Sequence, residues 1–390
     1  MTAPSALPLR LREVDRVADL SPAAWDRLAG PGGFYLSHAW LRLLEEQPLV
    51  SARYVAAFVG ERLVGALPLY CVESEPNPWY RPERYRDLLG VDGDYLLAGA
   101  RSAYRNTLLL DPGLAPGRAA GVLEELVGAG LRTAASLGLA GLVLLFLTSG
   151  ACATLARSAP LALALDEVEA EFPRCEGGIP GYLASLGHNR RRNVRRELAA
   201  FAEAGWELGE EDLHGCWRDV ARLLANVQQR HGHRSSVRGL ERLLERQAAV
   251  VGDRSVVFTC RDENGALAGA ALMFRWSGVL YGRLVGFDYE RLRGTFEYFN
   301  LAFYRPLHYC SRHGLTTLHL GIESREAKAL RGATMRPLWS AVVPVGAPLG
   351  EGRATVRRAE LVHRQRNELR AYSDARLPDD WALPDLLSQG

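Results

Sequence analysis

Lysine is almost absent from this chain: 47 of its 390 residues are basic, and Lys328 is the only lysine. The other basic residues are arginines, which fits a GC-rich coding sequence and makes the single lysine a candidate for a specific role. Acidic residues number 45, so the formal net charge is only +2. The chain as a whole is therefore not a binder of polyanions, and any contact with nucleic acid requires a local basic patch.

Features that define several other classes of protein are also missing. The six cysteines form no C-x-x-C pair, and His231 and His233 have no third ligand at a standard spacing, so we expect no disulfide framework and no metal. There is no Walker loop and no G-x-S-x-G motif. The most apolar run, residues 139–147, is about half as long as a membrane span, and the N-terminal residues are too charged for a signal peptide. We expect a cytoplasmic chain without an integral membrane segment.

The length of the chain, with 48% hydrophobic and 24% charged residues, predicts two domains rather than one core. Helices, a hairpin, a strand, a long helix and a strand are predicted twice in that order. The hairpins FVGERLVGALPLY and CRDENGALAGAALMF are the clearest internal match. We predict an α/β (α+β) protein with domains at residues 1–175 and 176–345 and a C-terminal extension at 346–390. Residues 85–89 are predicted as a strand and residues 354–372 as a helix.

Residues 279–337 form the most informative segment, which predicts a strand, a helix, a second strand and a basic loop. The helix opens near Glu297 and stops at Gly314, and the flanking strands are apolar. A strand–helix–strand unit places its functional groups at the C-terminal ends of the strands. Lys328 and Arg331 follow just after that end, where two cations can meet an anion or a developing negative charge.

Three motifs in this segment resemble a known family. LYGR-x-x-G, a helix ending in Y-x-x-x-x-Y-C-x-x-x-G, and K-x-x-R-G are similar to the C-terminal half of the FemAB-like proteins of the GNAT superfamily. The similarity extends from Gly181 to Pro337 and more faintly over the N-terminal half. It implies two tandem GNAT-like domains (the acyl-CoA N-acyltransferase fold) and transfer of an acyl or aminoacyl group to an amine. The chain departs from the family pattern at Ala327, where His or Tyr is usual, and at Asn300, where a carboxylate is common.

Acyl transfer to an amine requires a neutral nucleophile, a polarised carbonyl and a proton path for the leaving group. We predict that Lys328 stabilises the oxyanion or binds phosphate, with help from Arg331. Asp288 accepts the amine proton or binds its ammonium form, and Glu323 competes for that role. Tyr304 donates a proton to the leaving group, unless it is a buried aromatic with a satisfied hydroxyl. Further candidates for the acidic and phenolic roles are Glu290, Glu326 and Tyr281.

The loop before the predicted helix is a candidate phosphate site. Arg291-x-x-Gly294-x-Phe296 stands where acyl-CoA-dependent GNAT enzymes carry a loop whose backbone N–H groups hold the pyrophosphate, and Arg293 adds a second cation. The bulky Phe296 replaces the small residue of that pattern, so the match is degraded. A polar loop with a pair of arginines is the alternative.

An arginine cluster in GHNRRRNVRREL provides a second candidate. On a helix, Arg192, Arg195 and Arg196 share one face, and arginine suits bidentate contacts with phosphate. The predicted role is to bind an RNA acceptor stem or the phosphates of a cofactor. The alternative is a solvated face that pairs with Glu197, Glu203 and the acidic run at residues 207–212.

We therefore predict an N-acyltransferase of the GNAT/Fem type whose C-terminal domain carries the chemistry. Its co-substrate is aminoacyl-tRNA or acyl-CoA, with no tightly bound cofactor; the degraded loop and the arginine cluster slightly favour aminoacyl-tRNA. The acceptor is an amine on a small molecule or a cell-envelope precursor. No helical coiled-coil arm is predicted between the repeats, which argues against a standard peptidoglycan bridge ligase. Two alternatives stay open: an acyl-CoA-dependent N-acetyltransferase, and a non-catalytic GNAT relic that binds nucleic acid or a protein partner.

Overall fold

The computed structural model describes residues 8–47, 50–75, 77–233, 235–350, 352–372 and 374–387. The chain forms two compact units: unit 1 holds residues 1–168, 336–368 and 377–390, and unit 2 holds residues 169–335 and 369–376. The chain passes into unit 2 within β7 (Leu161–Pro173) and returns within β13 (Thr334–Pro344). Domain boundaries at residues 175 and 345 stay predictions.

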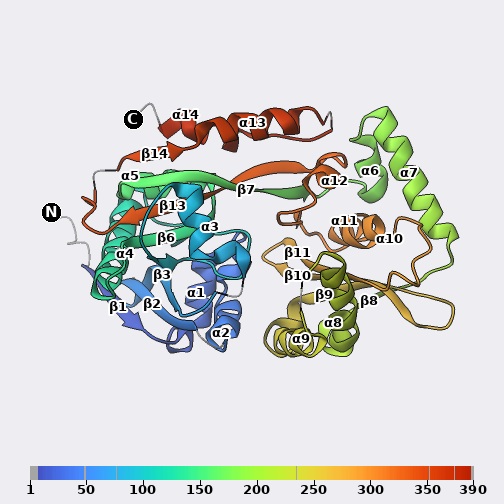
Figure 1. The fold of residues 1–390 in the computed structure, drawn as a ribbon, viewed down its shortest axis with the longest axis horizontal. Coiled ribbons are helices and arrows are strands. Elements are labelled where there is room, and N and C mark those ends of the chain that lie inside the picture. The colour runs from blue at the N-terminus through green and yellow to red at the C-terminus, as the bar shows by residue number, and fades with distance from the viewer. Residues whose placement is uncertain are drawn as a thin grey trace, which may run out of the picture. The chain divides into compact units, whose positions relative to one another are not determined.

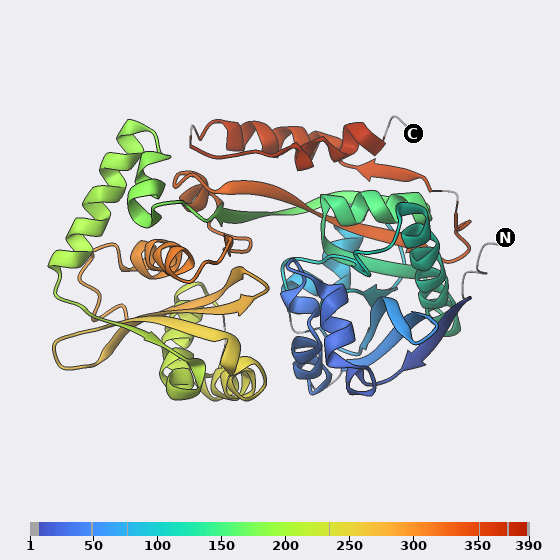
Figure 2. The same cartoon turned by 180° about the vertical axis from the view of Figure 1, so that it is seen from behind.

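Unit 1 is a mixed sheet with helices packed on it (Figures 1 and 2). Besides β7 and β13, its strands are β1 (Leu9–Val14), β2 (Val50–Val59), β3 (Arg62–Val72), β4 (Tyr95–Ala98), β5 (Leu109–Leu110), β6 (Gly141–Thr148) and β14 (Ala354–Arg357). They lie in the order β1-β2-β3-β4-β6-β13-β7, with β5 beside β3 and β14 beside β7. The helices are η1 (Val17–Asp19), α1 (Pro22–Ala29), η2 (Phe34–Leu36), α2 (His38–Glu45), η3 (Pro78–Tyr80), α3 (Pro82–Leu89), α4 (Pro116–Ser136), α5 (Ser149–Ser158), η6 (Asp379–Ala382) and α14 (Leu383–Leu387), and α13 (Ala359–Arg370) crosses the boundary between the units.

Helix packing on both faces of this sheet forms the core of unit 1. A Cβ at Gly65 of β3 would lie 2.7 Å from Val122 of α4, so the missing side chain allows that helix to approach closely. On the other face, the ring of Trp25 in α1 meets Tyr54 of β2 edge to face at 5.7 Å. Tyr54 is three residues from Ala57, which pairs with Gly65. Because side chains alternate along a strand, Tyr54 points to the face opposite that of Gly65.

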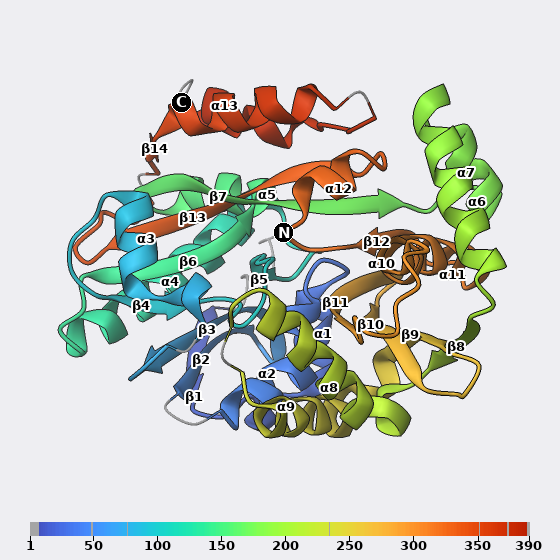
Figure 3. The same ribbon diagram turned by 45° about the vertical axis from the view of Figure 1, so that its right-hand side comes forward.

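Unit 2 repeats this plan (Figure 3). Its strands are β8 (Glu207–Glu211), β9 (Ser255–Arg261), β10 (Leu267–Trp276), β11 (Val279–Phe287) and β12 (Thr317–His319), which with the end of β7 lie in the order β8-β9-β10-β11-β12-β7. The helices are α6 (Gly178–Ala184), α7 (His188–Glu203), α8 (Leu213–Arg230), α9 (Val237–Val251), η4 (Gly252–Arg254), α10 (Glu297–Phe299), η5 (Asn300–Tyr304), α11 (Arg305–Arg312) and α12 (Arg325–Ala329).

The two faces of the unit 2 sheet are covered by different helices. Gly286 of β11 lies against Leu223 of α8, and a Cβ there would come within 2.6 Å of that side chain. On the opposite face, a Cβ at Gly269 of β10 would lie 2.9 Å from the side chain of Leu301 in η5. Both glycines are therefore required by packing: Gly286 allows α8 to approach one face, and Gly269 allows η5 to approach the other.

Most predicted elements are confirmed, but β4 and β13 were not predicted, and three other segments differ. Residues 85–89 belong to helix α3 and not to a strand, because Pro82 starts a helical turn and Gly90 ends it with φ of +63°. Residues 354–357 form β14, which pairs in parallel with β7, so the helix begins only at Ala359. The acidic run at residues 207–212 contains β8, which pairs with β9. In each case a local cap or a tertiary pairing outweighs the propensity of the segment.

The helix predicted from Glu297 to Gly314 is confirmed but is not regular. Its middle, η5, is a π-helical turn between α10 and α11. The Asn300 amide donates to the carbonyl of Phe296 at 3.0 Å and to the carbonyl of Glu197 on α7 at 3.3 Å, so a side chain takes part where the regular ladder is broken. Such turns occur frequently at functional sites.

Candidate functional site

In unit 2 two neighbouring parallel strands separate. β11 and β12 pair only at Val279 with Thr317, Leu280 with Leu318, and Tyr281 with His319. β12 then ends, whereas β11 continues to Phe287. In the part of the chain that the structure describes, the edge of β11 beyond that point has no strand partner, and residues 282–285 become partly exposed within an otherwise buried strand. A strand edge that has no neighbouring strand is a place where an extended ligand can add to a sheet.

A β-bulge lies where the strands separate. On the β10 side, Leu272 faces Leu284 but Met273 faces Gly282, so Arg283 is the extra residue of β11. A bulge bends its strand and redirects the backbone groups next to it, and bulges are frequent beside active sites.

The last pair of the ladder holds a buried histidine that sequence reasoning missed. Nε2 of His319 lies 2.7 Å from a carboxylate oxygen of Glu169 on β7, and both side chains are almost fully buried. The ring of Tyr281 packs against the imidazole at 5.1 Å. Nδ1 of His319 is buried without a hydrogen-bond partner. A signal was present, because Glu169 ends one predicted strand (residues 162–169) and His319 is the penultimate residue of another (residues 315–320), but the sequence does not show that these strands are neighbours.

The structure brings together two predicted site residues, Arg331 and Tyr304. Glu197 of α7, a second residue that sequence reasoning missed as a site residue, contacts both of them. Nη2 of Arg331 donates to both carboxylate oxygens of Glu197 at 2.9 Å, and its Nε donates to the Tyr304 hydroxyl at 2.9 Å. That hydroxyl in turn donates to Glu197. The Arg331 guanidinium also stacks on Phe299, 3.2 Å from the ring centre. All three polar side chains are buried, so the network joins α7, η5 and the segment after β12.

Burial raises the pKa of the Tyr304 hydroxyl well above its ordinary value, although the positive charge of Arg331 acts in the opposite direction. The phenol therefore stays protonated at neutral pH, with its proton directed at Glu197.

Lys328 is buried on α12 and binds backbone. Its Nζ donates to the carbonyls of Leu320, Gly321 and Ile322 at 2.8, 3.1 and 2.5 Å. An ammonium group has three N–H donors, and these contacts match that number. The lysine therefore holds the chain immediately after β12 in place, and a direct role in catalysis stays a prediction.

Glu323, the predicted acidic residue of this loop, is exposed. It and Ser324 both have positive φ, of 64° and 45°, which is unusual for residues with a side chain. Burial raises the pKa of Tyr298 on α10, and a hydrogen bond with the Ser324 side chain opposes that shift. The loop is thus fastened at both ends, by Lys328 and by Tyr298, in a conformation that its own residues disfavour.

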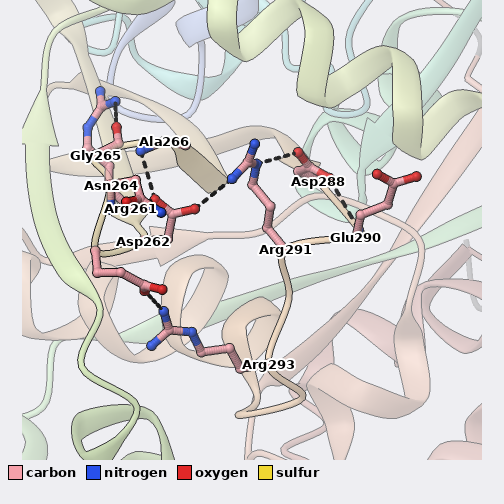
Figure 4. A network of polar contacts seen from close by, with 10 residues as sticks. Arg261, Asp262, Asn264, Gly265, Ala266, Asp288, Glu290, Arg291 and Arg293 are labelled. Atoms are coloured by element: carbon pink, nitrogen blue, oxygen red, sulfur yellow. Dashed lines mark hydrogen bonds and ion pairs between the residues drawn. The ribbon is translucent and has the colours of Figure 1, made fainter.

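Ion pairs occupy the arginines of the predicted phosphate loop, within the loop and with the turn between β9 and β10 (Figure 4). Arg291 lies between Asp262, at 2.7 Å, and Asp288, at 3.0 Å. Arg293 pairs with Glu263 and lies over the ring of Trp206 at 4.4 Å. Among the described residues no hydrogen bond or ion pair joins Asp288 or Arg291 to the Tyr304–Arg331 network. The structure therefore separates the predicted residues into two groups.

A carboxylate of the protein also occupies the backbone donors of this loop. Oε1 of the buried Glu297 accepts the N–H of Arg293 at 2.8 Å and contacts the Thr295 hydroxyl at 3.0 Å. The Trp206 indole N–H donates to that hydroxyl at 3.1 Å. Gly294 has φ of +71°, and Phe296 has φ of +65°. The turn forms as predicted, but the carboxylate of Glu297 accepts its hydrogen bonds in place of a phosphate.

The arginine cluster lies on a helix, as predicted, and three of its predicted acidic partners, Glu197, Glu210 and Glu211, bind elsewhere. Arg192, Arg195 and Arg196 are exposed on α7 and have no ion pair within the described residues. Glu197 instead binds Arg331, and the β8 carboxylates bind arginines on other elements. Arg196 lies 5.9 Å from the ring centre of Phe296, so the basic face adjoins the loop described above.

Neither a metal site nor a membrane span was found in the described chain. No group of three or more histidine, cysteine, aspartate or glutamate side chains there is arranged to hold a metal ion. None of its helices is both long and apolar enough to cross a bilayer.

Two repeats of this design, one of them with separated strands, define the tandem GNAT fold. FemX has this fold: it shares 11% identity, with 86% of this chain and 98% of FemX covered and a TM-score of 0.58. A tandem GNAT protein from the clavulanic acid biosynthesis pathway shares 15% identity over 87% of this chain and 99% of that one, with a TM-score of 0.50. A conserved protein of unknown function from Bacteroides thetaiotaomicron shares 11% identity over 87% and 99%, with a TM-score of 0.54.

The chain belongs to the FemAB-like family. The model of this family, which is described as peptidoglycan biosynthesis/recognition, matches residues 118–370. The resemblance inferred from the motifs is thereby confirmed. A comparison with curated proteins finds no match.

Proposed function

We propose that this protein is an N-acyltransferase that moves an aminoacyl group from aminoacyl-tRNA to an amine of a peptidoglycan precursor, with the reaction in unit 2. The observation that carries the proposal is the separation of β11 from β12 after the Tyr281–His319 pair. It leaves the end of β11 without a neighbouring strand, beside a bulge and next to a buried histidine–carboxylate pair.

The choice of donor rests on the loop at residues 288–296 and on α7. A coenzyme A pyrophosphate needs free backbone N–H groups and uncommitted cations at this loop. Here Glu297 already accepts the Arg293 N–H, and Arg291 is paired with two aspartates. The exposed arginines of α7 are uncommitted, and their spacing suits the phosphates of a nucleic-acid backbone. These contacts favour tRNA over coenzyme A.

His319 is the proposed proton acceptor. The Glu169 carboxylate next to Nε2 favours a proton on that nitrogen, which leaves the lone pair of Nδ1 unpartnered in a water-poor site. In the reaction the amine nitrogen bonds to the acyl carbon, the ester C–O bond of the donor breaks, and the amine proton passes to Nδ1. The released tRNA hydroxyl takes up that proton from Nδ1, so the imidazole returns to its starting form. Lys328 contributes by fixing the chain after β12, and catalytic roles for Asp288, Tyr304 and Glu323 stay predictions.

The donor is tested by supplying each candidate to the whole protein. We would incubate it with a stem peptide carrying a free amine and either total charged tRNA or acetyl-CoA, with and without ribonuclease. Transfer from charged tRNA that ribonuclease abolishes supports the proposal. Ribonuclease-insensitive transfer from acetyl-CoA would reverse the choice of donor. Binding of tRNA without transfer from either donor would indicate the non-catalytic alternative.

His319→Gln tests the chemistry. The glutamine amide can still donate to Glu169 but offers no base, so we expect transfer to fall by about 10²–10⁴-fold with the fold intact. The pH dependence of the remaining rate should lose the limb that reports a base. His308→Gln, an exposed histidine of α11, is the control and should leave the rate unchanged. Equal rates for the two variants would exclude His319 as the base.

A further inference from the structure

The side chain of Phe296 in unit 2 is explained neither by the packing around it nor by the proposed reaction. The backbone of this residue has φ of +65°, a left-handed conformation that a bulky side chain rarely adopts. Such strain persists only where the surrounding structure imposes it, and it is concentrated at active sites and ligand sites. A glycine would fit this conformation without strain, so the presence of a phenyl ring here requires a reason.

Hydrogen bonds from buried groups hold the backbone of Phe296 in this conformation. Its carbonyl accepts the backbone N–H of Asn300 at 3.0 Å and the side-chain amide of Asn300 at 3.0 Å. The residues on either side of it are joined, since the Thr295 hydroxyl contacts the carboxylate of Glu297 at 3.0 Å. Asn300 and Glu297 are both buried. The ring is therefore presented from a fixed backbone position.

The ring of Phe296 stands apart from the aromatic cluster that follows it. Tyr298, Phe299 and Phe303 pack edge to face on one another. Phe296 is only half-buried, and within the described chain no other aromatic ring contacts it. The guanidinium of Arg196 lies 5.9 Å from its ring centre, at the outer limit of a cation–π contact. Part of its aromatic surface therefore stays open to solvent, beside a loosely placed cation.

That cation belongs to a row of arginines that are free to bind an anion. Arg192, Arg195 and Arg196 lie on one exposed face of α7, and none of them has an ion pair within the residues that the structure describes. The two arginines of the loop before Phe296 differ, because both are already held by carboxylates. The uncommitted positive charge beside the ring is thus supplied by α7.

A partly open ring next to uncommitted guanidinium groups suits a single strand of nucleic acid. Proteins bind unpaired strands with positive charges along the backbone and with aromatic side chains on which the bases stack. A base inside a duplex cannot use such a ring, because neighbouring base pairs cover both of its faces. An isolated phosphate or an acidic peptide would use the charges and leave the ring without a partner.

We propose that Phe296 is a stacking platform for an unpaired base at the 3′ end of an RNA, with Arg192, Arg195 and Arg196 binding the adjacent phosphates. The identification of this RNA as the aminoacyl donor rests on the proposed function. The amino acid of a charged tRNA is esterified to its unpaired 3′ end, which is the part that must enter unit 2. The Asn300 amide joins the carbonyl of Phe296 to that of Glu197, so the platform adjoins the network around Arg331.

The test measures binding of RNA that carries no amino acid, so its outcome does not depend on transfer. Fluorescence anisotropy of the whole protein would use a labelled single strand of about eight nucleotides that ends in CCA, a length within the range of single-strand sites. The comparison strand has the same phosphates but abasic sites in place of its 3′ bases. We expect the intact strand to bind about 5- to 100-fold more tightly, the effect of one stacked base. Equal affinity for the two strands, or no binding of the intact strand at about 1 mM, would overturn the proposal.

Phe296→Leu keeps an apolar side chain but removes the ring. It should weaken binding of the intact strand by about 5- to 100-fold and leave binding of the abasic strand unchanged, which also shows that the variant is folded. Phe296→Tyr keeps the ring and should retain the parent affinity. Trp217→Leu is the matched control, because Trp217 is a half-buried aromatic with Arg218 at 4.6 Å from its ring centre, on α8 at the other face of the sheet. If Phe296→Leu binds the intact strand as tightly as Trp217→Leu does, Phe296 is not the platform.

Arg196→Gln separates the role of the charges from that of the ring. It should weaken binding of the intact and abasic strands by a similar factor and reduce the dependence of affinity on salt, since it removes a phosphate contact. A loss confined to the intact strand would contradict the phosphate role. Transfer from charged tRNA by a protein whose RNA binding ignores Phe296 would overturn this proposal alone. Base-dependent binding through Phe296 without any transfer would overturn the proposed function alone.

Discussion

The buried ion pair between Glu197 and Arg331 should behave as one unit when either partner is removed. Glu197→Gln leaves the buried guanidinium of Arg331 without its carboxylate partner. Arg331→Met leaves the buried carboxylate of Glu197 without its cation. Removing one partner of a buried pair costs about 3–5 kcal/mol. Replacing both by uncharged side chains of similar size removes the unpaired charge, so the double variant should be destabilised by only about 1–2 kcal/mol.

These changes should be local to unit 2, because the network joins α7, η5 and the segment after β12. The measurement is therefore native-state hydrogen exchange, followed by mass spectrometry, on peptides from α7 and from residues 297–312. Each single variant should accelerate exchange in both peptides together, and the double variant should largely restore protection. An exposed pair supplies the control: Arg312 binds Glu210 at 2.6 Å, and its removal should cost no more than about 1 kcal/mol.

The result that would refute this reasoning is additivity. If the double variant loses as much protection as the two single variants combined, the two side chains are not coupled, and the network does not position α7 relative to η5. A loss confined to one of the two peptides would also contradict the assignment, since the hydrogen bonds of Arg331 reach both elements.

Three further predictions concern other residues. Burial raises the pKa of Cys216, Cys260 and Cys310 to about 12, so a thiol reagent at pH 8 should label the native protein only at the other, more exposed cysteines, Cys71 and Cys175, and label the rest after unfolding. Burial raises the pKa of Asp111, but the Gly113 N–H, Arg62 and Arg27 outweigh it and hold that pKa below its usual value. Asp111 thus stabilises the fold above pH ~4, and this contribution is lost as the pH falls through the folded pKa, so Asp111→Asn should flatten the acid side of a stability–pH profile. Lys328→Met leaves the carbonyls of Leu320 and Ile322 without the lysine donor, whereas that of Gly321 keeps the Ala170 N–H, and the change should destabilise unit 2 by about 2–4 kcal/mol in urea unfolding.

The parts of the fold that could be predicted are those determined by local pattern. The hairpin β9–β10 and the helices α8 and α9 follow from periodicity and turn residues, and the structure confirms them. The separation of β11 and β12 could not be predicted in this way, since the length of a ladder depends on partners distant in sequence. The same limit applies to Glu197, which lies 134 positions before Arg331 and was interpreted as a surface partner of its neighbouring arginines.

A comparison of the two repeats explains why only one of them is assigned the chemistry. In unit 1, β4 and β6 also begin as a parallel pair, from Tyr95 with Gly141 to Leu97 with Val143, and β4 then ends. Asn106 fills the position beyond: its N–H donates to the carbonyl of Phe146 at 2.8 Å, and its side-chain amide donates to that of Leu145 at 3.2 Å. The edge of β6 is therefore satisfied by the protein itself. In unit 2 no described strand lies beside β11 beyond Tyr281, which is why a ligand is proposed there.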